Sequence, residues 1–481
     1  MPRLFFQFRL SVFLRKGLKN AVSMLNYAYC RECSPEPFRR PANASINSVR
    51  TEKVKTVKIG IVGFGTVGAG AAATLLANRE VIARRSGVDL ELVRVADLDI
   101  TTDRGVAVPA GTLTVNADDA IRDADIVVEL VGGTTFAKTL ILKALNAGKP
   151  VVTANKALLA KHGAELFAAA EANNVDLYYE ASVGGGIPVI KALREGLVAN
   201  RVRRIYGILN GTCNYILTRM EREGADFAEV LADAQKLGYA EAEPSLDIDG
   251  FDTAHKASIL ASLAYGHWFG MDPVTVEGIR DISLADLRYA DELGYRIKLL
   301  AIIKAIDGSV EIRVHPTLIP KNALLANISD VFNGVMVEGD MVGQTLFYGR
   351  GAGRNATASA VVADITDVAV NLANNCPRRV MFREKAQYSA LTPPGETRSR
   401  YYLRLQVRDA SGVMAAITRV LADQDISISS LIQPETSGRE LVPLVILTHQ
   451  ASEARLREAV RRIEALPTVG DKAKIFRIED L

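Results

Sequence analysis

The chain has 481 residues, more than one ordinary hydrophobic core organises, so we expect two or three domains. Hydrophobic residues make up 48% of the chain and charged residues 23%, which is typical of a globular protein and excludes a disordered one. The net charge of +3 is too small to indicate a nucleic-acid or anionic-membrane partner. The uncharged run over residues 257–271 is shorter than the roughly 20 residues of a membrane-spanning helix.

Cysteine usage and the N-terminal segment bear on location. The four cysteines, Cys30, Cys33, Cys213 and Cys376, are too few and too scattered for a disulfide framework, which favours the reducing cytoplasm. Residues 1–55 are predicted to be a disordered or poorly defined extension. Their first half is basic and lacks acidic residues, as a targeting peptide does, but it has no continuous apolar core and no small-residue cleavage site.

Ordered structure is expected from residue 57, where an apolar strand, a glycine turn and a helix follow one another in VKIGIVGFGTVGAGAAATLL. VDLELVRVAD and ADIVVELVGG continue with strands, and AKTLILKALNAG is a helix. KPVVTANKALLAKHG then repeats strand, turn and helix. Because strands that alternate with helices build parallel sheets, we predict an α/β fold with a Rossmann-type dinucleotide-binding domain over residues 56–180.

Residues 63–68 spell G-x-G-x-x-G after a strand and at the start of a helix, the setting that dinucleotide binding requires. The first glycine permits a tight turn, the second lets the backbone approach a pyrophosphate, and the third lets helix and strand pack closely. The free N–H groups of the helix start attract the anion. The predicted cofactor-binding residues are Gly63, Phe64, Gly65, Thr66, Val67 and Gly68, with Gly132 after a later strand.

Asp97 ends the second strand, where a carboxylate accepts hydrogen bonds from the ribose hydroxyls of NAD and repels the extra phosphate of NADP. Arg94 and Arg104 are close in sequence, but neither is directly beside Asp97. The pattern therefore favours NAD over NADP. The alternative is that Asp97 only caps a turn.

The rhythm of strands and helices changes after about residue 176. Strand, glycine-rich turn and helix recur in VDLYYEASVGGGIPVIKAL and in RVRRIYGILNGTCNYILTRM, and GRGAGRNATASAVVADITDVAVNLA adds a glycine loop that leads into a helix. The prolines and charges of ALTPPGETRSR mark a linker, assigned to residues 376–400. Residues 401–481 follow the order strand, helix, strand, strand, helix, strand, which predicts a ferredoxin-like βαββαβ module.

Five carboxylates precede one lysine in AEAEPSLDIDGFDTAHK. Asp252 and Lys256 are four residues apart, so on a helix they share one face with the acid toward the N-terminus. The helix continues with apolar residues and is predicted to be buried, where a charged pair is costly unless it is paired or used. From spacing alone, a catalytic role and a structural ion pair are equally open. The five acids are Glu241, Glu243, Asp247, Asp249 and Asp252.

Several separated signatures resemble one family. VVTANKALLA, YYEASVGGGIPVIKAL, ILNGTCNYIL, LGYAEAEPSLDIDGFDTAHK and GAGRNATASAVVADI occur in the order typical of monofunctional homoserine dehydrogenase, and VRDASGVMAAI is similar to ACT domains. The resemblance implies reversible NAD(P)H-dependent reduction of L-aspartate 4-semialdehyde to L-homoserine, in threonine, methionine and isoleucine biosynthesis. It also implies an α+β catalytic and dimerisation domain at residues 181–375, whose final helix returns to the Rossmann domain, and a C-terminal ACT domain.

The resemblance further implies roles for single residues. Lys256 would donate and accept the proton at the substrate oxygen, Asp252 would orient it, and Lys156 would be a second lysine near both substrate and nicotinamide. Glu241 would bind the substrate's ammonium group, with Asp247 and Lys156 nearby.

Two more sets of residues follow from the resemblance. Gly351 would lie in a loop that closes over the cofactor. A monovalent cation, Na⁺ or K⁺, would be held mostly through backbone carbonyls by Glu180, Val183, Gly185 and Ile187. Many relatives carry an arginine before the aspartate that corresponds to Asp97, and its absence here counts against NADP.

The ACT-like segment suggests feedback regulation. Homoserine feeds threonine synthesis, so the resemblance makes L-threonine the expected effector. A strand is predicted to end at Asp409, and Gly412 lets the backbone approach a ligand at the start of the next helix, whose free N–H groups would bind a carboxylate. Because ACT modules commonly pair edge to edge, a homodimer or homotetramer is expected.

Two other functions agree with part of the sequence. Another semialdehyde dehydrogenase is disfavoured because no cysteine lies in a nucleophilic setting for acylating chemistry. A catalytically inactive sensor of nucleotide and amino acid is the alternative from another class, and the retained Lys156, Lys256 and Asp252 argue against it. The five histidines are scattered, which disfavours a zinc site.

Overall fold

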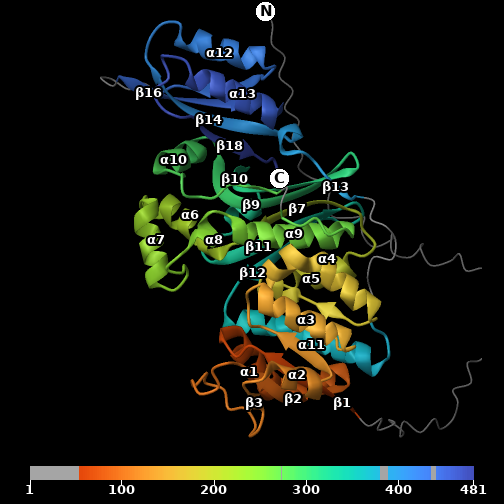
Figure 1. Ribbon diagram of the computed structural model, residues 1–481. Helices are drawn as coiled ribbons and strands as arrows, with labels where there is room; N and C mark the ends of the chain where they lie inside the picture. Colours follow the sequence, from red (N-terminus) through yellow and green to blue (C-terminus); the bar gives the residue numbers. More distant parts are fainter. Residues whose placement is uncertain (1–53, 272–273, 380–387, 435–439) are drawn as a thin grey trace, which may run out of the picture. The chain divides into compact units, whose positions relative to one another are not determined.

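The structure is a computed structural model that describes residues 54–271, 274–379, 388–434 and 440–481 (Figure 1). Residues 1–53 of the predicted N-terminal extension lie outside the described residues. Cys30 and Cys33 belong to this part. The described chain contains a parallel sheet, an antiparallel sheet with helices, and a C-terminal βαββαβ unit, so the predicted α/β fold class is confirmed.

A six-stranded parallel sheet forms the N-terminal domain. Its order, β3-β2-β1-β4-β5-β6, is that of doubly wound dinucleotide-binding domains. The central strands β1 and β4 bury valine and isoleucine side chains on both faces, as strands of a covered parallel sheet do. The strands are β1 (Lys55–Val62), β2 (Val88–Ala96), β3 (Leu113–Thr114), β4 (Ile126–Glu129), β5 (Val151–Thr153) and β6 (Leu177–Tyr178).

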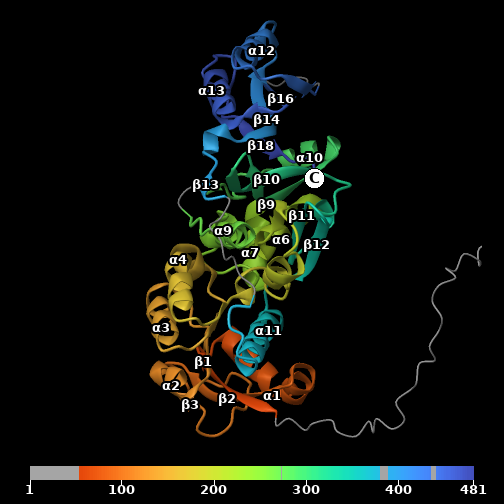
Figure 2. The same ribbon diagram turned by 90° about the vertical axis from the view of Figure 1, so that its right-hand side faces the viewer.

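Five helices pack around this sheet: α1 (Thr66–Ser86), α2 (Ala117–Asp123), α3 (Thr135–Asn146), α4 (Lys156–Ala172) and, from much later in the chain, α11 (Arg354–Ala373). α11 lies beside α1 in both ribbon views (Figures 1 and 2). The contact is close because Gly70 has no side chain: a Cβ there would lie 3.2 Å from the Cβ of Ala358.

α11 is, within the described residues, the one helix long and apolar enough to span a membrane by length and composition. Its apolar residues Val361, Ile365 and Val368 are fully buried against the N-terminal domain. Their burial in the protein core accounts for the apolar composition of the helix.

The middle domain is built on an antiparallel sheet in the order β12-β11-β7-β9-β10. Helices α6 and α9 cover one face of it, and α9 also packs against α4 of the N-terminal domain. The strands are β7 (Val202–Ile208), β8 (Thr275–Val276), β9 (Tyr295–Ile306), β10 (Ser309–Pro320), β11 (Phe332–Gly339) and β12 (Gly343–Arg350). The helices are α5 (Val189–Lys191), α6 (Gly211–Glu223), α7 (Phe227–Lys236), α8 (Ser245–Ile248), α9 (Phe251–Tyr265) and α10 (Leu284–Glu292), with single turns η1 (Glu180–Ser182), η2 (Ala192–Gly196) and η3 (Leu325–Asn327).

The C-terminal domain has the predicted βαββαβ order, with its strands arranged β18-β14-β16-β15. The linker assigned to residues 376–400 contains regular structure. β13 (Ala390–Leu391) pairs with β10. β14 already begins at Arg398, and the side chains of Ser399 and Tyr401, two residues apart on the same face of the strand, are both buried. The remaining elements are η4 (Pro394–Glu396), β14 (Arg398–Arg408), α12 (Val413–Asp423), β15 (Ile428–Ile432), β16 (Leu441–Thr448), β17 (Ala451–Ser452), α13 (Glu453–Glu464) and β18 (Lys474–Ile478).

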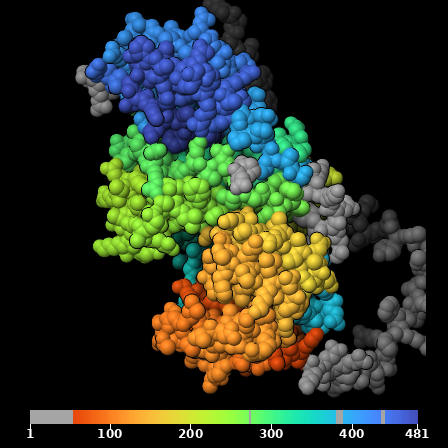
Figure 3. Space-filling view, in the orientation of Figure 1, coloured from red at the N-terminus to blue at the C-terminus, as the bar shows by residue number. Residues whose placement is uncertain are grey.

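The middle and C-terminal sheets are joined. β18 pairs in parallel with β10 at Thr317↔Arg477 and Leu318↔Ile478, so one path of hydrogen-bonded strands passes through both domains. In Figure 3 the C-terminal domain (blue) adjoins the middle domain (green). The β18 edge of the C-terminal domain is therefore covered by its own chain.

Candidate active site

Asp252 lies at the centre of a buried cluster of charged side chains. One carboxylate oxygen accepts a hydrogen bond from Lys256 Nζ at 2.6 Å, and the other lies 3.0 Å from Lys156 Nζ. Lys256 Nζ also donates to the backbone oxygen of Leu209 at 2.7 Å. The side chains of Asp252 and Lys256 are 4% and 10% exposed, whereas that of Lys156 is 36% exposed. One acid thus holds two lysines, of which one reaches toward solvent.

The local sequence explains how α9 presents this pair. Gly250 adopts a φ of +90°, which favours glycine, and so turns the chain sharply into the helix. Asp252 then falls in the first turn and Lys256 one turn later on the same face, as predicted from the spacing. Both residues are buried, so the predicted buried setting of the pair is correct.

Lys156 reaches the cluster from the first residue of α4. Asn155 caps this helix by accepting from the N–H of Leu158 at 3.1 Å, and its amide donates to the backbone oxygen of Gly133 at 2.7 Å. The "ANK" segment is therefore fixed directly to the loop that contains Gly132.

The residues that support this loop through hydrogen bonds were not predicted from the sequence. Buried Glu129 accepts from the N–H groups of Val131 and Gly132 at 3.0 and 3.2 Å, and from the Thr153 hydroxyl at 2.6 Å. Burial raises the pKa of Glu129. The available signal was an acidic residue at the end of an otherwise apolar strand, because a buried carboxylate needs hydrogen-bond partners.

Asn210 is a further residue that the sequence analysis missed. Its side-chain oxygen caps α6 by accepting from the N–H of Cys213, while its amide nitrogen donates to Asp247 at 2.7 Å and to Asp252 at 2.9 Å. One amide therefore holds two carboxylates side by side. An asparagine between a buried strand and a helix was the signal, because asparagine is a preferred N-cap residue.

The five acids of the acidic segment have three different settings. Asp249 forms an ion pair with Arg280, and Glu243 accepts hydrogen bonds from Ser245, so both support the local chain. Asp247 and Asp252 share Asn210 and face the lysines. Glu241 is exposed and adds to the negative charge around Lys156.

The charges in the cluster shift one another's pKa values. Burial acts to raise the pKa of Asp252, but the attraction of Lys256 and Lys156 outweighs it and holds that pKa well below its usual range. Burial acts to lower the pKa of Lys156, but Asp252, Asp247 and Glu241 more than offset it, so that pKa is raised. Burial and the charge of Asp252 raise the pKa of Asp247.

The glycine-rich turn has room for an anion at the start of α1. At Gly63 the φ is +103°, and a Cβ would lie 2.5 Å from the backbone of Leu130, while a Cβ at Gly68 would lie 1.9 Å from the oxygen of Gly63. At Gly65, which precedes α1, a Cβ would meet nothing within 4 Å, and no side chain of the described residues caps the helix. Thr66 and Val67 begin α1. Space above free N–H groups fits the pyrophosphate of a dinucleotide.

Asp97 lies at the carboxyl end of β2, beside this turn. Its carboxylate accepts the N–H of Phe64 at 2.5 Å and the N–H of Asp99 at 3.0 Å. The turn-capping role that was considered as an alternative is therefore real. Each oxygen keeps a further lone pair for a ribose hydroxyl, so the two roles are compatible.

The residues assigned to a cation lie together in a buried loop. Glu180, Val183, Gly185 and Ile187 are all buried. The Glu180 carboxylate accepts the N–H groups of Ile190 and Lys191 at 2.8 and 2.7 Å, so it caps α5. No cluster of three His, Cys, Asp or Glu residues suited to a metal occurs in the part of the chain that the structure describes.

Gly351 lies against this loop. A Cβ at Gly185 would come within 2.4 Å of the Gly351 backbone oxygen, and the N–H of Gly186 donates to the oxygen of Arg350 at 3.1 Å. The loop before α11 is thus packed on the chain that bears the assigned cation residues.

Asp409 and Gly412 lie in the C-terminal domain, between β14 and α12. Gly412 has a φ of +89°, a Cβ there would meet nothing within 4 Å, and no side chain of the described residues caps α12. Asp409 is exposed. These two residues lie on a different domain from the Asp252 cluster.

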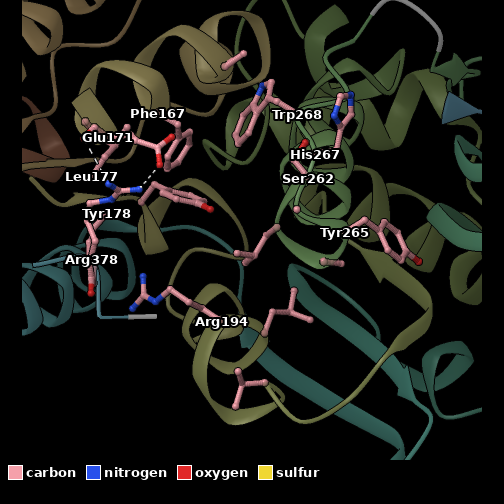
Figure 4. A pocket seen from close by; sticks show the side chains of 18 of the residues that line it. Phe167, Glu171, Leu177, Tyr178, Arg194, Ser262, Tyr265, His267, Trp268 and Arg378 are labelled. Carbon is pink, nitrogen blue, oxygen red and sulfur yellow. Dashed lines mark hydrogen bonds and ion pairs between the residues drawn. The ribbon is translucent and has the colours of Figure 1, made fainter. Parts of the chain in front are cut away.

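A cavity of about 760 Å³ lies away from this cluster (Figure 4). Its lining includes Phe167 and Glu171 near the end of α4 and Ser262 and Tyr265 near the end of α9. Lys156 and Asp252 lie at the starts of the same helices, so the cavity is at the opposite end of the helix pair. Figure 4 shows Arg378 paired with Glu171 there, at 2.9 Å.

Comparisons with family models agree with this division into domains. Residues 63–180 match the NAD-binding domain of homoserine dehydrogenase, residues 188–366 match the homoserine dehydrogenase model, and residues 401–468 match the ACT domain.

Curated relatives and solved structures agree as well. The chain is 45% identical over 418 residues to the homoserine dehydrogenase of Neisseria gonorrhoeae, covering 86% of this chain and 96% of that one. It is 45% identical over 421 residues to that of Pseudomonas aeruginosa, with the same coverage. A crystal structure of a homoserine dehydrogenase from Thiobacillus denitrificans is 45% identical, with a TM-score of 0.83, and the match covers 89% of this chain and 99% of that one.

A more distant likeness concerns the cofactor. A hyperthermophilic archaeal homoserine dehydrogenase in complex with NADPH is 27% identical, with a TM-score of 0.55 over 66% of this chain and 98% of that one. Taken with the relatives that match nearly from end to end, these findings show that the chain belongs to the homoserine dehydrogenase family, oxidoreductases with a nicotinamide cofactor.

Proposed function

We propose that the protein catalyses the reversible NAD(P)H-dependent reduction of L-aspartate 4-semialdehyde to L-homoserine, as a step of threonine, methionine and isoleucine biosynthesis. The observation that carries the proposal is the Lys156–Asp252–Lys256 cluster at the starts of α4 and α9. It supplies a proton donor, a fixed negative charge and a second cation within one site.

The bound nicotinamide supplies the hydride, and the protein supplies placement and protons. Reduction of an aldehyde leaves an alkoxide that needs a proton from a positioned acid. Lys256 serves as that acid: two of its three N–H groups are held by Asp252 and Leu209, which leaves one for the substrate oxygen.

Asp252 orients Lys256 and Lys156 at once. Lys156, the more exposed lysine, contacts the substrate on the cofactor side. Asp247 and Glu241 attract the ammonium group of the amino-acid substrate, because unpaired carboxylates in a partly buried site favour a cation. In the oxidative direction Lys256 accepts the hydroxyl proton, so homoserine oxidation should rise with pH.

The test is a steady-state assay of homoserine oxidation with NAD and with NADP, read as formation of the reduced nicotinamide. Aspartate semialdehyde reduction checks the reverse direction. Turnover with homoserine would support the proposal, and binding of nucleotide and amino acid without turnover would favour the sensor alternative. The ratio of the two kcat/KM values gives the cofactor preference, for which Asp97 favours NAD.

A monovalent cation, Na⁺ or K⁺, is proposed to bind the backbone oxygens of the loop that contains Val183, Gly185 and Ile187. Support comes from the burial of that loop and from Glu180, whose backbone oxygen lies in it while its side chain caps α5. Activity in a buffer of a bulky organic cation should fall and recover when Na⁺ or K⁺ is added. Unchanged activity would exclude a required cation.

L-threonine is proposed as the effector of the ACT domain, with its carboxylate at the N–H groups that follow Gly412 and with Asp409 nearby. The domain's own β18 edge is taken by β10, so pairing into a homodimer or homotetramer would use the other edge, β15. Inhibition of homoserine oxidation by threonine should weaken in Asp409→Ala but not in Asp423→Ala, at the end of α12. A cytoplasmic location, which fits a nicotinamide-dependent biosynthetic step, can be checked by fractionation.

A further inference from the structure

We propose that Glu277 is a positioning residue through which the ACT domain holds the substrate-binding carboxylates in place. This inference rests on the proposed function at one point, which is that Asp247 and Asp252 border the substrate. Every contact in it lies within the described residues.

Glu277 follows β8 at the edge of the middle sheet. β8 pairs in parallel with β10, and the N–H of Glu277 still donates to the backbone oxygen of Val314 at 2.8 Å. After this bond the chain leaves the sheet and passes over the short loop between α8 and α9, residues 249–250.

The three residues after Glu277 each hold this loop. A Cβ at Gly278 would lie 2.2 Å from the backbone oxygen of Ile248, so the two chains touch directly. The N–H of Ile279 donates to the same oxygen at 2.8 Å, and Arg280 binds both carboxylate oxygens of Asp249.

The loop held in this way carries the active-site acids. Asp247 precedes it, and Asp252 follows it in the first turn of α9. Gly250, between them, has little space: a Cβ there would lie 3.1 Å from Val276 Cγ1 and 3.3 Å from the Glu277 oxygen. A displacement of Glu277 must therefore move the loop, because packed backbone cannot absorb it.

Two arginines of the ACT domain bind the Glu277 side chain. Arg477, on β18, binds its two oxygens at 2.5 and 2.9 Å, and Arg457, on α13, binds one of them at 2.7 Å. Both arginines also bind Glu453, the first residue of α13. Glu277 is thus attached to the strand and the helix of the ACT domain at once.

This ion cluster differs from an ordinary surface salt bridge. Arg477 is 2% exposed as a side chain and pairs bidentately, which fixes direction as well as distance. Exposed pairs contribute little because both partners are free to move. Here a shift of α13 against the middle domain must either carry Glu277 with it or break its bonds to the arginines. The ACT domain is therefore connected to Asp247 and Asp252 through Glu277 and the three residues that follow it.

The test compares three full-length variants with the wild type. Glu277→Gln keeps the shape of the side chain and removes its charge. Arg457→Met removes the more exposed of the two arginines. Arg461→Met is the matched control, because Arg461 lies one turn further along α13 and, among the described residues, pairs only with Glu458 of the same helix, at 2.6 Å. The measurements are kcat, KM for homoserine, KM for the nicotinamide cofactor, thermal midpoint, and amide hydrogen exchange of residues 247–252.

A coupling of the usual size should raise the KM for homoserine in Glu277→Gln by roughly fivefold or more. Arg457→Met should raise it less, and Arg461→Met should leave it unchanged. The KM for the cofactor should stay constant, since the glycine-rich turn lies on another domain. Exchange of the 247–252 amides should be faster in Glu277→Gln.

A purely structural role would give another pattern: a lower thermal midpoint with the KM for homoserine and the loop exchange unchanged, which would overturn the inference. An equal rise of both KM values would overturn it too, since that is general loosening. If Glu277→Gln does not fold, Arg457→Met decides by the same criteria. Failure of the wild type to oxidise homoserine would refute the proposed function instead.

Discussion

Asp252 and Glu277 are each held by two cations, and the choice of cation separates their roles. Asp252 is bound by Lys156 and Lys256, whereas Glu277 is bound by Arg457 and Arg477. Lysine is a point charge that can release a proton, while arginine stays charged and binds carboxylates through a rigid fork. Lysines therefore suit the cluster where a proton is to be transferred, and arginines suit the cluster that joins two domains.

The two clusters also differ in how they are closed. The side chain of Asp252 is 4% exposed and those of Lys156 and Lys256 are 36% and 10% exposed. The side chain of Glu277 is 35% exposed and lies between Arg457, 50% exposed, and Arg477, 2% exposed, so Asp252 is the more deeply buried acid. In both clusters burial acts to raise the pKa of the acid, and the neighbouring cations outweigh it and lower that pKa. The acids are thus alike and ionised. Replacing single cations is the direct way to test the contrast.

The largest effect is expected at Lys256. Lys256→Met removes the proton donor, and loss of a general acid costs about 10²–10⁴ in kcat. The measurement is kcat for homoserine oxidation, with cofactor binding followed separately to show that the N-terminal domain is intact.

Lys256→Arg is the matched control for charge. It retains a cation beside Asp252 but does not release a proton at neutral pH. We expect it to be nearly as inactive as Lys256→Met. Substantial activity in Lys256→Arg would mean that the residue acts only as an ion-pair partner of Asp252.

The second effect is on stability. Arg477→Met leaves Glu277 and Glu453 with Arg457 as their remaining partner. Breaking a fully buried pair by removing one side costs about 3–5 kcal/mol, but Glu277 is 35% exposed and keeps Arg457, so a cost of about 1–3 kcal/mol is expected. The free energy of unfolding of the C-terminal domain should fall by that order. Arg461→Met, on the exposed face of α13, should change it by less than about 0.5 kcal/mol. Similar thermal midpoints for the two variants would mean that the junction contributes no more than a surface pair.

The sequence predicted what depends on local pattern. The glycine spacing located the cofactor turn, and the spacing of Asp252 and Lys256 placed both on one face of a buried helix. The βαββαβ order of the C-terminal domain followed from alternating apolar runs.

Contacts between distant segments were beyond the sequence. Asn210 reaches Asp252 across 42 positions, and Arg477 reaches Glu277 across 200. In neither pair are the two residues related by the periodicity of a helix or a strand. No local pattern singles out Glu277, because the two arginines reach it through the pairing of β18 with β10.

A smaller effect is expected at Asp97. Asp97→Ala removes the charge that repels the extra phosphate of NADP, so the ratio of kcat/KM for NAD to that for NADP should fall by about tenfold, or roughly 1.4 kcal/mol. Because Asp97 also accepts the N–H of Phe64, the KM for NAD should rise in the same variant. Asp97→Asn keeps an acceptor for that N–H and should change preference with less loss of affinity. A wild type that prefers NADP would show that nearby basic residues outweigh this carboxylate.

The smallest effect concerns pH and Asp252. The pKa of Asp252 is lowered in the folded protein, so its contribution to stability is fully present above the unfolded pKa of about 3.9 and is lost as the pH falls toward the folded value. Only the start of this loss is accessible. The thermal midpoint of the wild type minus that of Asp252→Asn should be constant from about pH 8 to pH 5 and shrink below about pH 4. Asp247 has a raised pKa and shares Asn210 with Asp252, so the comparison is repeated in an Asp247→Asn background. If this difference in thermal midpoint stays constant below pH 4 in both backgrounds, the two lysines do not stabilise the ionised form of Asp252.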